Sequence, residues 1–171
     1  MKGYRLGIIG IAALLLIACG RVDPQRPTQR KSATPAVDSA QLALMELNLR
    51  LTQAADDQLS QLAQQEGNYV LYERGTWVQT VVWGEGEKVN PNEECTVHMR
   101  ISSLDGQLYC DVEQTALVGK HELPAAIDEN IPEWKHGAQL LLLAPWYAAY
   151  GIQGTEYIPP YENVRIELEI K

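Results

Sequence analysis

The spacing of apolar residues changes at Gly67, and this change constrains the fold more than any other feature of the chain. From residue 38 to residue 67, leucine and methionine recur every three or four positions, as on one face of a helix. Asp38 is a suitable N-cap with Gln41 at the capping-box position, and Gly67 is a suitable stop. Beyond Gly67 the apolar period is two residues, which is typical of strands. We therefore expect one long helix, over residues 38–67, followed by a strand-rich domain over residues 68–171.

Six segments of the second part are predicted to be strands. They are rich in β-branched and aromatic residues and cover residues 69–72, 77–83, 96–102, 107–112, 140–144 and 164–170. Asp105-Gly106, between the third and the fourth, is a strong signal for a two-residue hairpin. Residues 123–131 are predicted to form a short helix that begins near Pro124 and ends at Pro132. Several strands with one short internal helix indicate an α+β domain built on an antiparallel sheet.

The two cysteines of this domain are predicted to be free thiols. A regular hairpin about Asp105-Gly106 places Cys110 opposite Ile101 and Cys95 about 20 Å away along the ladder. A disulfide needs Cα atoms within about 7 Å of each other. A catalytic thiol is the alternative, but neither cysteine lies near a convincing set of histidine and carboxylate residues.

Composition excludes two classes of partner. The chain has 14 Lys+Arg against 22 Asp+Glu, a formal net charge of −8. A nucleic-acid partner would need a basic patch, so none is expected. The three Cys and three His are scattered without the spacing of a ligand set, so no metal is expected.

The first 18 residues have the pattern of a secretory signal peptide. Lys2 and Arg5 precede an apolar run over residues 6–18, which is shorter than the roughly 20 residues that span a bilayer as a helix. Leu16-Ile17-Ala18-Cys19 resembles a bacterial lipobox, which implies that Cys19 is lipidated and anchors the chain to a membrane. An ordinary signal peptide with a chance cysteine is the alternative.

The segment after Cys19 is expected to be a disordered, flexible tether. Residues 19–37 are rich in Pro, Gln, Ser, Thr and Arg and show no apolar periodicity. Gly20 directly follows Cys19, and no acidic run comes soon after it. By analogy with bacterial lipoproteins, we expect the outer membrane as the location, with the domain facing the periplasm.

A series of motifs from Asn90 to Lys171 resembles the domain of FKBP-type peptidyl-prolyl cis-trans isomerases. In the family's order and spacing, they are Val97-His98-Met99, Leu104-Asp105-Gly106 with Tyr109, Val118-Gly119-Lys120, Ala149-Tyr150-Gly151, Ile158-Pro159-Pro160 and the strand from Val164 to Ile170. With its lipobox and leading helix, the chain is similar to the lipoprotein FKBP isomerases of Bacteroidetes, including the group associated with gliding motility. The resemblance implies a twisted antiparallel sheet wrapped on a short α-helix.

The resemblance also implies which residues form a catalytic pocket. The matching catalytic positions are Tyr109, Asp111, Leu123, Pro124, Ile127, Tyr150, Ile158 and Ile166, and those expected to contact substrate are Met99, Tyr109, Ile127, Tyr150 and Ile158. Tyr150 keeps the hydroxyl that the family uses as a donor to its ligand. Ile127 replaces the tryptophan of the pocket floor, and Pro124 lacks the backbone N–H usually offered there. Cys110 stands where the family has its pocket aspartate, and Asp111 follows one residue later.

The function implied by the resemblance is isomerisation of Xaa-Pro bonds, which assists the folding of exported envelope proteins and needs no cofactor. The expected partners are proline-containing unfolded or exported polypeptides. The alternative keeps the fold but not the activity: a catalytically weak or inactive binding or chaperone module of an envelope complex. For the helix over residues 38–67, two interpretations stay open: it packs on its own domain, or it contacts a partner or a second copy in a homodimer. A purely structural lipoprotein is a further interpretation.

Overall fold

The structure is a computed structural model that describes residues 39–171. The predicted signal peptide, the lipidation site at Cys19, the tether and the N-cap Asp38 lie outside the described residues. In chain order, the elements are α2 (Ser39–Glu66), β1 (Val70–Leu71), the 3₁₀ turn η2 (Glu73–Gly75), β2 (Trp77–Trp83), β3 (Glu94–Ser103), β4 (Leu108–Leu117), α3 (Ala125–Asp128), the 3₁₀ turn η3 (Ile131–Glu133), β5 (Ala138–Ala144) and β6 (Val164–Ile170). This order confirms the predicted α+β class.

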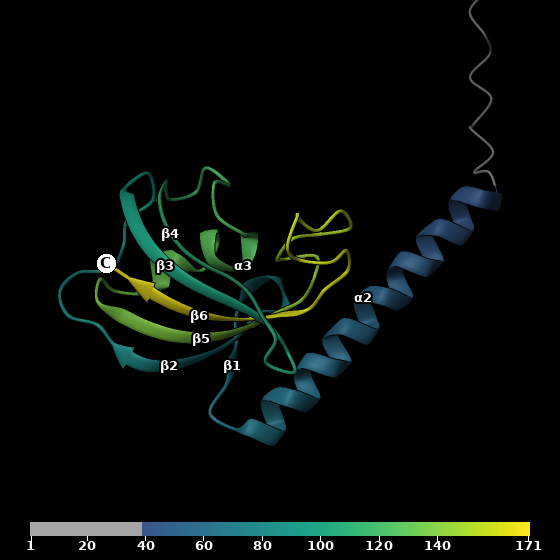
Figure 1. Cartoon of the computed structure of the whole chain (residues 1–171), viewed down its shortest axis with the longest axis horizontal. Coiled ribbons are helices and arrows are strands. Elements are labelled where there is room, and N and C mark those ends of the chain that lie inside the picture. The colour runs from purple at the N-terminus through teal and green to yellow at the C-terminus, as the bar shows by residue number, and fades with distance from the viewer. Residues whose placement is uncertain (1–38) are drawn as a thin grey trace, which may run out of the picture. The chain divides into compact units, whose positions relative to one another are not determined.

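The strands form one six-stranded antiparallel sheet in the order β1-β2-β5-β6-β3-β4. The short helix α3 lies against one face of this sheet (Figure 1). Between them lies the core, in which Ile127 of α3 and the sheet residues Ile101, Leu142 and Ile166 are fully buried. Removing these aliphatic side chains from water is the main force that holds the helix on the sheet.

The β3–β4 hairpin has the register that its turn residues predict. Cys110 pairs with Ile101 and Cys95 with Ala116, and the register shifts by one residue only next to the turn, between Ile101 and Ser102. Cys95 and Cys110 are both free thiols, as predicted. Both strands are longer than the alternating pattern alone predicts.

The helix predicted over residues 123–131 is shorter than expected. Only Ala125–Asp128 is α-helical, and a separate 3₁₀ turn follows at Ile131–Glu133. The reason lies in two residues after α3. Asn130 uses its side-chain amide to donate to the Ala126 carbonyl, at 3.0 Å, where a continuing helix would place a backbone N–H. Pro132 has no N–H to donate and disfavours helical backbone in the residue before it.

The long helix α2 divides into two halves with different surroundings. In the second half, Ala55, Leu59 and Ala63 form a buried stripe against the sheet, and Leu59 is fully buried with Leu143 of β5. Gly67 ends the helix in the left-handed conformation (φ +75°), and its N–H donates to the Ala63 carbonyl.

In the first half of α2, large apolar side chains remain exposed. They are Leu42, Leu44, Met45, Leu47 and Leu49, each more than half exposed. The second half of the helix therefore packs on its own domain, as one of the two interpretations predicts. Contact with a partner or a second copy stays a prediction for the first half. None of the helices in the described part of the chain has the length and apolar character needed to cross a membrane.

Candidate functional site

Most of the predicted pocket residues meet in one cluster between the sheet and α3. Its members come from β3, β4, the segment before α3, α3 itself, the loop before β6 and β6: Met99, Tyr109, Cys110, Leu123, Ile127, Tyr150, Ile158 and Ile166. Pro124 precedes α3 at its N-cap position and is half-buried. The chain thus brings together side chains that are up to 67 residues apart in sequence.

These residues form two layers. Ile127 and Ile166 are fully buried, and Ile158 and Met99 are 1% and 2% exposed, so they form an apolar floor. Tyr109, Cys110, Tyr150 and Pro124 are only half-buried. A bound molecule can therefore contact the tyrosines directly, while the aliphatic floor makes their surroundings poor in water.

Tyr150 is the polar group of this site that is free to act on a ligand. Among the described residues, no side chain or backbone group forms a hydrogen bond with its hydroxyl. Burial raises the pKa of Tyr150, and the neighbouring Cys110 raises it further. The phenol therefore stays protonated at physiological pH and offers one O–H donor to a carbonyl.

Tyr109 has a different role because its hydroxyl is already engaged. It donates to Oε1 of Glu162 at 2.9 Å, and burial followed by this carboxylate raises the pKa of Tyr109. Its ring packs against the core cluster. The hydrogen bond joins β4 to the segment that leads into β6 and holds the ring of Tyr109 in place. Because its hydroxyl is engaged, Tyr109 can contribute its ring to a wall of the site but not a hydrogen-bond donor.

Asp111 does not join the other predicted residues. It pairs with Arg100 on the outer face of the sheet, whereas its neighbour Cys110 faces the core cluster with Ile101. Successive side chains of a strand point to opposite faces, so the two residues cannot line the same pocket. The prediction that places Asp111 in the pocket therefore disagrees with the structure.

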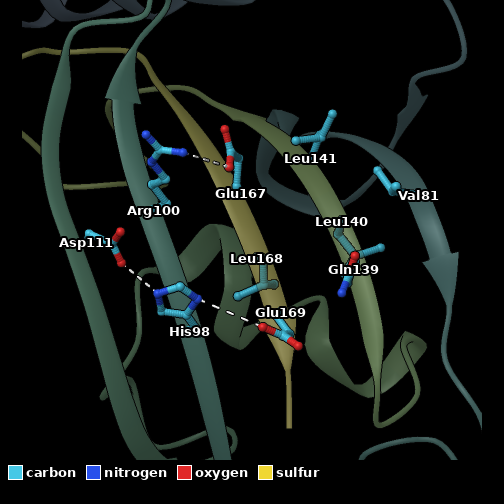
Figure 2. A pocket seen from close by; sticks show the side chains of 10 residues that line it. All are labelled: Val81, His98, Arg100, Asp111, Gln139, Leu140, Leu141, Glu167, Leu168 and Glu169. Carbon is cyan, nitrogen blue, oxygen red and sulfur yellow. Dashed lines mark hydrogen bonds and ion pairs between the residues drawn. The ribbon is translucent and has the colours of Figure 1, made fainter.

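Asp111 instead lies at one side of a shallow groove of about 500 Å³ on the outer face (Figure 2). Its carboxylate lies 2.6 Å from Nε2 of His98, and Arg100 on β3 faces its cross-strand neighbour Glu167 on β6 at 3.8 Å. All these groups are substantially exposed, and they form hydrogen bonds or ion pairs with one another. No cluster of three or more His, Cys, Asp or Glu within the described range has the arrangement of a metal site.

The loop between β5 and β6 contributes residues that sequence reasoning missed. Ile152 and Tyr157 are 56% and 64% exposed, in the same loop as Tyr150 and Ile158. The Thr155 hydroxyl accepts hydrogen bonds from the N–H groups of Tyr157 and Ile158, which fixes this part of the loop. The signal that would have indicated Tyr157 is an aromatic residue directly before the Ile-Pro-Pro motif.

The long helix also contacts this loop. Oδ1 of Asp56 accepts a hydrogen bond of 2.5 Å from the hydroxyl of Tyr147, which lies three residues before Tyr150. At the other end of the loop, Asn163 donates to Gln58 at 2.9 Å and accepts from the Trp146 N–H at 2.9 Å. The second half of α2 is thus part of the frame that positions Tyr150.

Comparison with known proteins identifies the fold. No family model and no curated protein matches the chain. Among solved structures, it is similar to a peptidyl-prolyl cis-trans isomerase from Pseudomonas syringae pv. tomato, with 20% identity and a TM-score of 0.59 over 70% of this chain and 92% of that one. It is also similar to FkpA from Escherichia coli, with 22% identity and a TM-score of 0.60 over 78% of this chain and 64% of that one. A third similar structure is the N-terminal domain of FKBP42 from Arabidopsis thaliana, with 23% identity and a TM-score of 0.54 over 61% of this chain and 90% of that one. The chain therefore has an FKBP-like fold.

Proposed function

We propose that this chain is an FKBP-type peptidyl-prolyl cis-trans isomerase that assists the folding of exported envelope proteins. The observation that carries the proposal is the unpartnered hydroxyl of Tyr150 above an apolar floor, in a fold shared with such isomerases. The lipobox at Cys19 supports a lipid anchor, with the domain on the periplasmic side of the outer membrane. The substrates would be proline-containing segments of unfolded polypeptides.

The proposed mechanism uses binding alone. Rotation about an Xaa-Pro bond must cross a barrier of about 20 kcal/mol, because the planar amide loses its resonance on the way. The twisted amide is less polar than the planar one, so an apolar site favours the transition state over the ground state. The half-buried rings of Tyr109 and Tyr150 would supply the contact surface, and the buried side chains of Ile127, Ile158 and Ile166 keep its surroundings apolar. The Tyr150 hydroxyl would hold a substrate carbonyl so that the proline ring lies in these apolar surroundings.

Two departures from the family's pocket predict a looser grip on the prolyl ring. Ile127 is fully buried and offers less flat surface than the tryptophan it replaces, and it has no indole donor. Pro124 offers no backbone N–H at the start of α3. We therefore propose catalysis that is slower than in family members with the complete pocket, rather than a different reaction.

The test is the rate of cis-to-trans isomerisation of a short Xaa-Pro peptide, measured with the wild type and with Tyr150→Phe. One neutral hydrogen bond contributes about 0.5–1.5 kcal/mol, so the variant should be roughly two- to tenfold slower. Tyr161→Phe is the matched control, because it removes the hydroxyl of a tyrosine 40% exposed in the same loop and should leave the rate unchanged. No acceleration by the wild type, across several residues before the proline, would contradict the proposal.

A second candidate function, association through α2, is favoured by the exposed apolar residues of its first half. Leu42 and Leu49 are 55% and 67% exposed and lie two helical turns apart on one face. We propose that this face contacts a second copy of the chain. Sedimentation velocity over a range of concentrations should then show a dimer for the wild type and a monomer for Leu42→Gln/Leu49→Gln. A wild type that stays monomeric would rule out the homodimer.

A further inference from the structure

Strand β2 leaves part of its outer edge without a partner. The outermost strand β1 pairs only with Trp77 and Val78, at the beginning of β2 (Figure 1). From Gln79 to Trp83, no described strand lies on the outer side of β2. An edge of this kind presents unpaired backbone N–H and C=O groups, with the spacing that another extended chain can match.

The free part of β2 also lacks the features that usually protect an edge. Its sequence from Trp77 to Trp83 contains no charged residue and no proline. Val81, Val82 and Trp83 are 55%, 43% and 76% exposed. The opposite edge of the sheet differs, because β4 carries the charged residues Asp111 and Glu113 on its exposed side. Charges on an edge strand discourage pairing with other chains, so the free edge of β2 is more open to a new strand than the edge of β4 is.

A cavity of about 140 Å³ lies directly beside this edge. Three aromatic residues line it, Tyr72, Trp83 and Trp134, together with Thr80, Ala138 and Leu140. The charged residues Lys88, Glu133 and Lys135 complete the lining, and Lys88 and Glu133 form an ion pair of 2.7 Å. The rings of Tyr72 and Trp134 pack at a centroid distance of 6.0 Å. Since Thr80 and Trp83 belong to β2, a strand added along β2 would bring its own side chains next to the cavity.

Trp134 adds an independent indication of a ligand. The residue is 5% exposed, and its indole N–H is buried without a hydrogen-bond acceptor in the part of the chain that the structure describes. A buried donor without a partner is rare in folded proteins and calls for an explanation. A carbonyl group of a bound polypeptide would supply the acceptor that this donor lacks.

From these observations, we infer that the free edge of β2 binds an extended, apolar polypeptide segment as an additional strand, with one apolar side chain in the cavity beside Trp134. Backbone hydrogen bonds to Gln79–Trp83 would provide the affinity, and the cavity would select the side chain. The site is separate from that of Tyr150, since none of the residues that line its cavity belongs to the predicted pocket. Its action does not depend on isomerase activity, because it binds segments with or without proline.

The test measures binding of a proline-free peptide to the full chain. The probe is a fluorescein-labelled decapeptide of alternating valine and threonine with Gly-Ser ends, followed by fluorescence anisotropy. Val81→Lys places a charge on the free edge at an exposed position and should weaken binding by at least about tenfold. Val112→Lys is the matched control on β4, at a position 38% exposed, and should bind as the wild type does. Thermal unfolding by circular dichroism should show that both variants are folded.

Trp134→Phe tests the cavity, because it keeps an aromatic ring and removes the N–H. It should weaken binding by between about twofold and about tenfold, the effect of one lost hydrogen bond. Equal binding by the wild type and Val81→Lys would overturn the inference, as would a wild type that does not bind the peptide. The inference would also fail if Val81→Lys abolished self-association of the chain without changing the binding of the peptide. The occupant of the β2 edge would then be a second copy of the chain.

Discussion

Replacement of Leu59 by alanine should destabilise the domain strongly, because this residue joins α2 to the sheet. Leu59 is fully buried and packs with Ala63 of the helix and Leu143 of β5. Removing a buried leucine side chain costs the transfer free energy of the lost atoms and leaves a cavity, together about 2–5 kcal/mol. At this domain size, each kcal/mol lowers the melting temperature by roughly 3–5 °C, so we expect a decrease of roughly 6–25 °C.

Leu47→Ala provides the matched control for this measurement. Leu47 belongs to the same helix but is 51% exposed, so its free energy of unfolding should change by no more than about 0.5 kcal/mol. Guanidinium unfolding of both variants gives their free energies of unfolding. An unchanged m-value shows that both variants expose the same amount of surface on unfolding, so that their free energies can be compared. The reasoning is refuted if Leu59→Ala unfolds at the same denaturant concentration as Leu47→Ala, because α2 would then be an appendage to the domain.

Two further predictions concern the end of the sheet that holds the C-terminus. The backbone oxygen of Lys171, assisted by Glu93, raises the pKa of His136 above its usual 6.5. The protonated form is favoured in the folded state, so its stabilisation is complete below pH 6.5 and is lost as pH rises through the raised value. His136→Asn should remove this pH dependence of the free energy of unfolding, and an unaltered profile would contradict the assignment. Gly84→Ala should destabilise more than Gly86→Ala: both have positive φ, but a Cβ on Gly84 would lie 2.4 Å from the His136 carbonyl oxygen, whereas Gly86 faces open space. Equal melting temperatures of these two variants would show that the contact can relax.

The parts of the fold that depend on local signals could be predicted from the sequence. Asp105-Gly106 determined the register of the β3–β4 hairpin, and this register placed Cys95 and Cys110 too far apart for a disulfide. Gly67 marked the end of α2 because a left-handed residue after a helix favours glycine. In each case, the decisive residue lies within a few positions of the structure it determines.

The parts of the site that the sequence did not predict depend on distant contacts. Nothing near Asp56 indicates that its carboxylate accepts a hydrogen bond from Tyr147, which is 91 residues away in sequence. The position of Asp111 on the outer face of the sheet could have been predicted, because strand alternation alone places it on the face opposite to Cys110. The resemblance to the family, whose pocket contains an aspartate, assigned Asp111 to the pocket although the alternation of side chains along a strand excludes it. The shortening of α3 needed the side-chain hydrogen bond of Asn130, which only the folded chain shows.

Exchange NMR of an Xaa-Pro peptide with a small amount of the protein is the measurement that tests the central claim most directly. It reports the rate of isomerisation, and the methyl signals of the protein report where the peptide binds. We predict cis–trans exchange peaks that grow with protein concentration, together with shifts of the Ile127 and Ile158 methyl signals. Tyr150→Phe should weaken both effects. Absence of exchange peaks, with methyl shifts confined to Val81 and Val82, would show that the chain binds polypeptides without isomerising them.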